Sequence, residues 1–403
     1  MIKSYLPILL LLSFLFSGCD TTSEKEEEST TKNEVSMEEQ YVFVGTYTRK
    51  EGHVDGKAKG IYVLQWKESA ASLTTVDTLA GLPNPSYVNL HPNGKYLYAA
   101  NELADGSEEV LGQVSAFSID PASRSYQQLS NVSAMGDAPC HVAVLGDKSH
   151  AVVANYVGGN VAVLPINGDG SLGEAVAVGQ HDGKGPNEGR QAAPHAHMVY
   201  PFPNSNSAFL AVDLGIDQII HYEWDQAEQK LNEMARTAIT PGAGPRHLDF
   251  HPSSNHLYVL SELNHTVEVF EYKSVDAAFE RKQAISTLPE ASTAVSYPAA
   301  IKVHPSGKFL YASNRGSTEE ENSIAIFLID KQGGELAFQQ VVHTGGNFPR
   351  DFEITPSGNF LLAANQNSGN IVVFKIDPES GDLSETGTDF AIPTPVCLKF
   401  LSI

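Results

Sequence analysis

The 403-residue sequence predicts an all-β fold, a seven-bladed β-propeller in which the C-terminal strand pairs with the N-terminal blade. A strand–turn–strand pattern recurs at intervals of about fifty residues, the spacing of propeller repeats. The last copy keeps only its first strand, and Tyr41–Thr46 matches the second strand of the other copies. Helical periodicity is nearly absent. The prolines that open the copies stand at positions 85, 139, 194, 245, 298, 349 and 395.

The copy at Gly244–Glu262 shows the pattern most clearly. Residues Arg246–Phe250 alternate as a strand, His251–Asn255 form a turn, and His256–Leu260 return as a second strand. Copies that start at positions 85, 298 and 349 follow the same pattern, and those at 139 and 194 follow it more loosely. In three copies a histidine precedes the turn proline, where we expect it to cap the hairpin. These residues are His91, His251 and His304.

The N-terminal residues predict export rather than a folded element. Residues 1–18 carry an early positive charge and a short apolar run, and therefore predict a signal peptide. The run ends in Leu15-Phe-Ser-Gly-Cys19, which resembles a bacterial lipobox and implies lipid attached to Cys19. An ordinary signal peptide is the alternative. Residues 19–40 are polar and acidic and predict a disordered tether, and 41–403 form the propeller. We therefore expect a lipoprotein of the cell envelope, held on the outer membrane or cell surface, or in the periplasm.

Charge and cysteine content limit the possible partners. The net charge of −22 argues against nucleic acid, because phosphate binding requires a basic face. A small anionic substrate remains possible where arginines gather in a pocket. Cys140 and Cys397 are predicted on inner strands separated by a blade, which disfavours a disulfide.

One mouth of the central channel should collect polar side chains from every blade. In a propeller, the start of each inner strand lies beside the end of the second strand, so residues at these two positions are expected to cluster. His197 shares a strand face with His195 and should lie deeper, whereas His141 and His247 should point away and pack between blades. The residues expected at the mouth are His195, Arg246, Arg350, Arg315, Glu262 and Glu102.

This set of residue types suits hydrolysis. A histidine beside arginine and glutamate can activate water and stabilise an oxyanion. The loop Gly183–Ala193, which contains Arg190, could fold over the mouth. The alternative is a ring of ion pairs that only holds blades together. We predict no metal and no cofactor, because His195 and His197 have no third ligand at a matching position. A calcium site built from the Asn, Asp and Glu ring stays open.

Several motifs together resemble the seven-bladed lactonase family, which includes the propeller-type 6-phosphogluconolactonases and the carboxymuconate cyclases. They are Tyr41-Val-Phe-Val-Gly-Thr-Tyr-Thr48, Gly60-Ile-Tyr62, Gly185-Pro-Asn187, Arg190-Gln191, Pro194-His-Ala-His197, Gly244-Pro-Arg-His247 and Pro349-Arg-Asp-Phe352. The resemblance covers residues 40–403. By motif, the active-site groups proposed for the cyclases correspond to His197 (or His195), Arg246, Glu262 and Arg315.

The resemblance implies a lactonase acting on a sugar-acid lactone. Water would be activated by His197 or His195, with Arg246 and Glu262 as the other catalytic groups. Arg315, Arg350, Arg190 and Glu102 would bind the substrate. A cytoplasmic 6-phosphogluconolactonase has no signal peptide, so the predicted export of this chain leaves open which lactone is its substrate. The alternatives are a carboxymuconate-type cyclase, or a non-catalytic surface propeller that binds a glycan or protein. An open mouth lined by arginine would favour the enzyme, and a plugged channel with an apolar rim would favour the scaffold.

Overall fold

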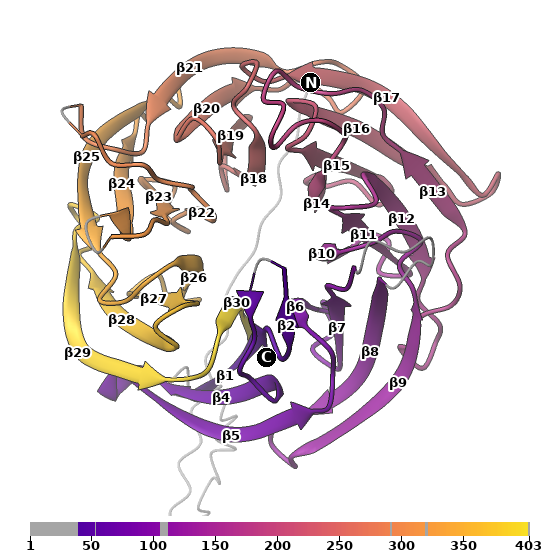
Figure 1. Ribbon diagram of the computed structural model, residues 1–403, viewed down its shortest axis with the longest axis horizontal. Helices are drawn as coiled ribbons and strands as arrows, with labels where there is room; N and C mark the ends of the chain where they lie inside the picture. The colour runs from indigo at the N-terminus through magenta and orange to yellow at the C-terminus, as the bar shows by residue number, and fades with distance from the viewer. Residues whose placement is uncertain (1–38, 53, 105–111, 291, 319–320, 402–403) are drawn as a thin grey trace, which may run out of the picture. The chain divides into compact units, whose positions relative to one another are not determined.

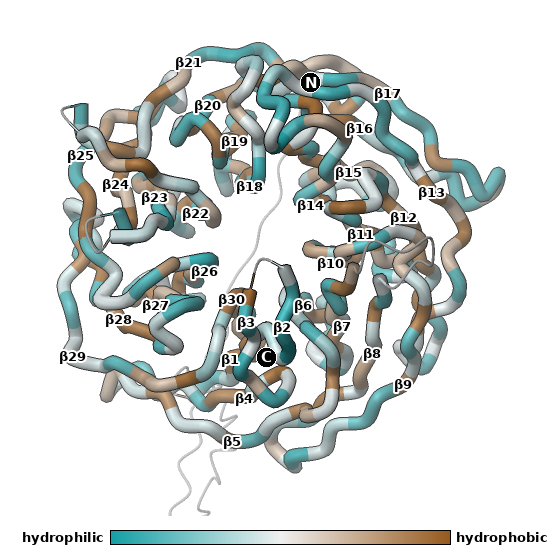
Figure 2. Tube along the Cα trace, viewed as in Figure 1, coloured by the Kyte–Doolittle hydropathy of each residue, from teal (hydrophilic) through white to brown (hydrophobic). Residues whose placement is uncertain are grey.

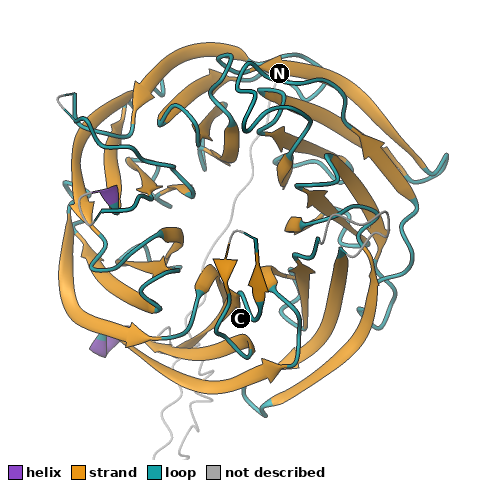
Figure 3. Ribbon diagram, in the orientation of Figure 1, coloured by secondary structure: helices purple, strands orange, loops and turns teal. Residues whose placement is uncertain are grey.

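The computed structural model describes residues 39–52, 54–104, 112–290, 292–318 and 321–401. The predicted signal peptide, the lipidation at Cys19 and residues 19–38 of the predicted tether lie outside these ranges. Within them, no helix is long and apolar enough to cross a membrane. Strands and loops account for nearly all of the described residues in Figure 3, and the named helical turn is the 3₁₀ turn η1 (Glu68–Ala70).

The described residues form seven four-stranded antiparallel sheets arranged as blades around a centre, as Figure 1 shows. Blade 1 combines β30 (Pro395–Leu401), β1 (Glu39–Thr46), β4 (Gly60–Lys67) and β5 (Ser72–Ala80). Blade 2 contains β6 (Pro85–Leu90), β7 (Tyr96–Asn101), β8 (Gln113–Asp120) and β9 (Ser125–Ser133). Blade 3 contains β10 (Pro139–Val144), β11 (His150–Asn155), β12 (Asn160–Pro165) and β13 (Ala177–Gln180). Blade 4 contains β14 (Ala196–Pro201), β15 (Ala208–Asp213), β16 (Gln218–Asp225) and β17 (Lys230–Ala238).

The remaining blades repeat this order from the inner to the outer strand. Blade 5 contains β18 (Pro245–Phe250), β19 (His256–Ser261), β20 (Thr266–Glu271) and β21 (Glu280–Ser286). Blade 6 contains β22 (Ile301–Val303), β23 (Phe309–Asn314), β24 (Ser323–Ile329) and β25 (Leu336–His343). Blade 7 contains β26 (Pro349–Ile354), β27 (Phe360–Asn365), β28 (Asn370–Ile376) and β29 (Leu383–Ala391). A separate hairpin pairs β2 (Lys50–Glu51) with β3 (Val54–Asp55).

The core lies between blades. Every residue of β11, β15, β19 and β23 is buried, because neighbouring blades cover both faces of these second strands. They accordingly read as apolar runs rather than as alternating patterns. The outermost strands such as β9 and β29 are largely exposed and polar, and Figure 2 shows teal and white stretches along the outer strands.

The turn histidines have two roles. In each of the three turns the histidine Nδ1 accepts a backbone N–H two residues later, at 3.1–3.2 Å, which confirms the predicted cap. The Nε2 atom of the same ring contacts a carbonyl of the next blade, at 2.8–3.0 Å. The repeat therefore encodes both its own turn and a contact to its neighbour.

The ring closes as predicted, through antiparallel pairing of β1 with β30 from Tyr41↔Leu401 to Thr46↔Pro395. β1 also pairs with β4 on its other side, so no edge of β1 is left unpaired. β1 begins two residues before the predicted start of the propeller, at Glu39. Cys140 and Cys397 are both buried and free, which agrees with the expectation that they form no disulfide.

Removal of the C-terminal strand should disrupt the fold. A chain truncated before Pro395 loses β30, so β1 keeps β4 as a partner but its channel-side edge is left unpaired. We expect a lower melting temperature and aggregation through the exposed edge, measured by thermal unfolding and light scattering. A truncated chain that melts like the full chain would contradict closure through this pair.

Candidate functional site

Six β-bulges place the central side chains of the site. In six blades the inner strand carries one extra residue near its start, opposite the end of the second strand. An extra residue breaks the alternation of the strand and re-aims its side chain, and bulges are frequent beside active sites. The six residues at these positions, called here the bulge residues, are Ser86, Cys140, His197, Arg246, Arg350 and Val396.

The register corrects one expectation. Pro245 pairs with Ser261 at the start of β18, and the residue in the same place on β14 is Ala196, which pairs with Asp213. The inner strand of blade 4 therefore begins at Ala196 rather than at Pro194, and His197 is the counterpart of Arg246. His195 was expected at the mouth, with His197 deeper; it is His197 that occupies the bulge.

His195 lies beside the site rather than in it. Its ring stacks on Tyr156 at a centroid distance of 4.5 Å, and its Nδ1 lies 2.9 Å from the Tyr156 carbonyl oxygen. Its backbone N–H donates to the Asp213 carboxylate at 2.8 Å. His195 therefore supports the wall formed by Tyr156.

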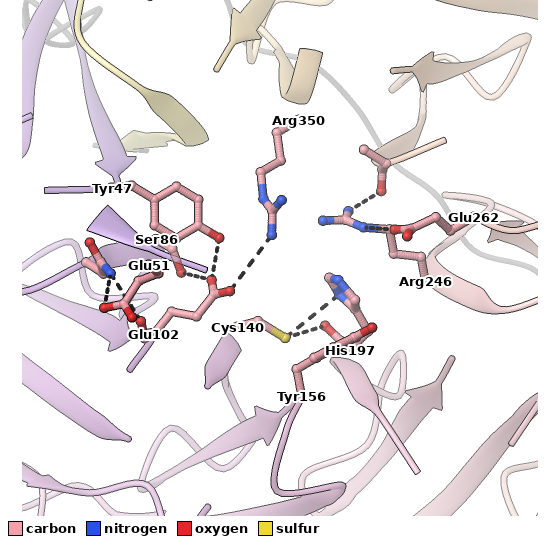
Figure 4. A network of polar contacts seen from close by, with 12 residues as sticks. Tyr47, Glu51, Ser86, Glu102, Cys140, Tyr156, His197, Arg246, Glu262 and Arg350 are labelled. Atoms are coloured by element: carbon pink, nitrogen blue, oxygen red, sulfur yellow. Dashed lines mark hydrogen bonds and ion pairs between the residues drawn. The ribbon is translucent and has the colours of Figure 1, made fainter. Parts of the chain in front are cut away.

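Six of the eight predicted site residues line one cavity of about 470 Å³, called here the site cavity. Below it the channel narrows to a neck of about 10 Å³, which Arg246 lines together with His197 and Arg350. Figure 4 shows these side chains and Glu102 pointing toward a common space. The site cavity is lined by Glu102, Arg190, His197, Glu262, Arg315 and Arg350, with Tyr156, Tyr297, Phe348 and others completing the wall.

Glu262 is the centre of a three-arginine cluster. Its Oε1 accepts from Arg190 at 2.6 Å, and its Oε2 accepts from Arg315 at 2.8 Å and lies 3.2 Å from Arg246 Nε. Burial alone would raise the pKa of the Glu262 carboxyl, but the guanidinium groups of these arginines outweigh it and lower the pKa to about 2. Glu262 is therefore ionised at neutral pH and fixes the arginines in place.

The ion pair of Arg246 with Glu262 is buried. The side chains of Arg246 and Glu262 are only 3% and 8% exposed, because the bulge turns Arg246 inward against Ala299, whose carbonyl oxygen accepts from its guanidinium. Burial lowers the pKa of Arg246, and the nearby Arg350 lowers it further. A broken pair here leaves a buried charge.

Glu102 forms a second acidic centre opposite. Its Oε2 accepts from Ser86 Oγ at 2.6 Å and from Tyr47 Oη at 2.8 Å. Arg350 Nη2 lies 4.0 Å from Oε1, and its guanidinium also lies over the Tyr47 ring at 5.4 Å. Arg350 makes no hydrogen bond to another described residue, so its N–H groups are available to a ligand in the site cavity.

His197 is buried and neutral between these two centres. Burial lowers the pKa of His197 well below 6.5, and the charges of Arg246 and Arg350 lower it further. Cys140 Sγ lies 3.4 Å from the His197 carbonyl oxygen and 3.8 Å from Nδ1. A neutral imidazole can accept a proton, so His197 has the protonation state that a general base needs.

Comparisons with known proteins show the family to which the chain belongs. The family described as "Lactonase, 7-bladed beta-propeller" matches residues 41–400. This chain belongs to the seven-bladed β-propeller lactonase family. It is similar to the 6-phosphogluconolactonase of Bacillus subtilis, 39% identical over 89% of this chain and 97% of the relative. A 6-phosphogluconolactonase of Formosa agariphila is 31% identical over 87% and 96% of the two chains. The chain is also similar to the solved structure of the Pseudomonas aeruginosa periplasmic gluconolactonase. The two are 30% identical and superpose with a TM-score of 0.82, over 91% of this chain and 99% of that one.

Membership identifies a lactonase-type enzyme with a small lactone as its substrate. The Arg-lined cavity is the arrangement expected for an enzyme. Val157 and Tyr297, exposed by 53% and 40%, add an apolar part to its rim, which had been expected only for a scaffold. Within the described residues no cluster of three or more His, Cys, Asp or Glu is placed to hold a metal ion.

In this lactonase fold His141 and His247 do not pack away from the channel, so that expectation is wrong. The His247 ring lies 5.4 Å from His197 and 5.7 Å from His141, and His247 Nε2 accepts from Arg246 at 3.3 Å. Each of these two histidines directly follows a bulge residue, and the broken alternation lets both residues of the pair line the channel. His141 and His247 also border a rear cavity of about 460 Å³ on the far side of the neck.

Sequence reasoning missed three residues of the cavity wall. Tyr156 directly follows the end of its second strand, as Glu102 and Glu262 do. Its position therefore predicted a place at the mouth, but only charged residues and histidines were selected as candidates. Tyr297 and Phe348 come from loops before inner strands. Phe348 has a φ of +66° and lies under the Arg315 guanidinium at 4.9 Å, and no sequence pattern marks it.

Proposed function

We propose that this enzyme hydrolyses a sugar-acid lactone of the 6-phosphogluconolactonase type in the site cavity. The observation that supports this most is the position of His197, a neutral base at the bottom of the site cavity. Four arginines line this cavity and the neck below it. Ester hydrolysis needs a base for water and positive charge for the oxyanion that develops on the carbonyl.

The contacts of each residue favour a particular role in the reaction. His197 removes a proton from water and returns it to the ring oxygen as the lactone opens. Arg350, which has donors to spare, holds the developing oxyanion and then the product carboxylate, supported by Arg246. Arg315 and Arg190 bind the polar groups of the substrate. Glu262, ionised and held by three arginines, orients them rather than transferring a proton.

A panel of lactones tests this proposal. The full chain would be incubated with 6-phosphogluconolactone, gluconolactone and an aliphatic lactone, and proton release followed with a pH indicator. We expect release above the spontaneous rate for the sugar-acid lactones. Arg350→Gln should lower the rate, because it removes the positive charge and most of the N–H donors of this side chain. No release from any of the three lactones would overturn the proposed function.

The pH dependence should reflect the low pKa of His197. Because burial and two arginines keep its ring neutral to well below pH 6.5, the base form persists as the pH falls. We expect kcat/KM to stay level from neutral pH down through 6.5 and to decline only at lower pH, when His197 becomes protonated. An acid limb centred at or above 6.5 would contradict this assignment. The spontaneous rate, measured without enzyme at each pH, is the control.

We also propose that Cys19 carries lipid and holds the enzyme in the cell envelope. The support is the short apolar segment that ends in Leu15-Phe-Ser-Gly-Cys19. Cys19→Ala should move the protein from the membrane fraction to the soluble fraction and abolish labelling by a fatty-acid probe. Wild-type protein that is soluble and unlabelled would contradict the proposal.

A further inference from the structure

The neck has the size of a single water molecule. Its volume of about 10 Å³ is close to the smallest cavity that holds one water. It separates the site cavity from the rear cavity, which measure about 470 and 460 Å³. A lactone fits the site cavity and cannot enter the neck.

The neck is also polar enough to hold water, which requires two to four polar partners. His197, Glu102 and Arg350 line both the neck and the site cavity. The Oε2 atom of Glu102 accepts from Ser86 Oγ and Tyr47 Oη, which fixes the carboxylate at the wall of the neck. The aliphatic side chain of Val396 also lines the neck and is 4% exposed.

We propose that the neck is the binding site for the attacking water. This inference rests on the proposed lactonase function. With the lactone carbonyl above the neck, the water oxygen forms a bond to the carbonyl carbon as an O–H bond breaks and its proton passes to His197. The ring C–O bond then breaks, and His197 gives the proton to the ring oxygen. The product is the open hydroxy acid, and no other reactant is needed.

A nucleophile site of this size should exclude alcohols. In a solvent-exposed site, methanol would compete with water for the lactone and yield a methyl ester. In the neck the additional methyl group of methanol has no room beside Val396. One methylene group in a close-fitting apolar pocket is worth roughly 10–200-fold in rate, so hydrolysis should dominate even in aqueous methanol.

The test is the ratio of methyl ester to free acid formed from the accepted lactone in aqueous methanol, measured by mass spectrometry at early times. Wild type should form almost no ester beyond the uncatalysed amount. Val396→Ala removes two methyl groups from the neck and should raise the ratio by roughly 10-fold or more. The matched control is Val157→Ala, the same change in the wall of the site cavity, which should leave the ratio as in wild type.

The product ratio does not depend on the amount of folded enzyme, so it stays informative if Val396→Ala lowers stability. Wild-type enzyme that forms ester in proportion to the methanol present would overturn the inference, because its water would then come from the open site cavity. Equal ratios for wild type and Val396→Ala would overturn it too. A wild type that hydrolyses no lactone would overturn the proposed function itself, and the inference with it.

Discussion

Glu262→Gln is expected to destabilise the folded enzyme by about 3–5 kcal/mol, the cost of removing one partner from a buried ion pair. The carboxylate is the shared acceptor for Arg190, Arg246 and Arg315. The side chains of Arg246 and Arg315 are only 3% and 4% exposed, so water cannot solvate the positive charges that lose their carboxylate partner. The neutral amide keeps the shape of the side chain but leaves the positive charges to repel each other.

Urea unfolding of Glu262→Gln beside Glu233→Gln would measure this effect. Glu233 also contacts an arginine, Arg236 at 2.7 Å, but these side chains are 40% and 30% exposed, so its loss should cost less than about 1 kcal/mol. If the two variants unfold at the same urea concentration, the buried cluster contributes nothing particular to stability. The activity of Glu262→Gln should fall as well, since its arginines would no longer be held.

His197→Gln is expected to lower kcat by a factor on the order of 10²–10⁴, as for the loss of a general base. The amide can hold water but cannot take its proton. The free energy of unfolding should change much less than for Glu262→Gln. Among the described residues, the only hydrogen-bond contact of the His197 ring is that of its Nδ1 with Cys140 Sγ, at 3.8 Å.

His195→Gln is the control that separates the two histidines of the His-Ala-His motif. His195 stacks on the outside of Tyr156 and does not line the site cavity or the neck. Its replacement should change kcat by less than about tenfold, far below the loss expected for a base. Equal losses in the two variants, or full activity of His197→Gln, would show that the base lies elsewhere.

The sequence repeat was sufficient to predict the propeller because each copy carries its own turn, its apolar strands and its contacts to the next blade. The closure of the ring followed from a strand missing at one end of the pattern and present at the other. The cluster of Glu102, Glu262 and Arg315 followed from topology, since these residues directly follow the ends of second strands.

The details of the site could not be obtained in this way. A bulge adds one residue to a strand without leaving a mark in the pattern of apolar and polar residues, so the inward turn of His247 was not foreseen. Pro194 was aligned with the opening prolines of the other copies, although the strand begins at Ala196. This alignment placed His195 where the structure has His197. Burial of Arg246 depends on the carbonyl of Ala299, from a different blade, and no local pattern encodes it.

The pairing of β1 with β30 also sets the order in which the enzyme can be completed. Tyr41 pairs with Leu401, so the propeller sequence between them must be made and moved to the compartment where the chain folds before this pair can form. During that time β1 has only β4 as a partner, and one row of its backbone groups is open to other chains. The first blade in the sequence is the last blade to be finished, and a chaperone that covers β1 would protect the newly made chain until its final strand arrives.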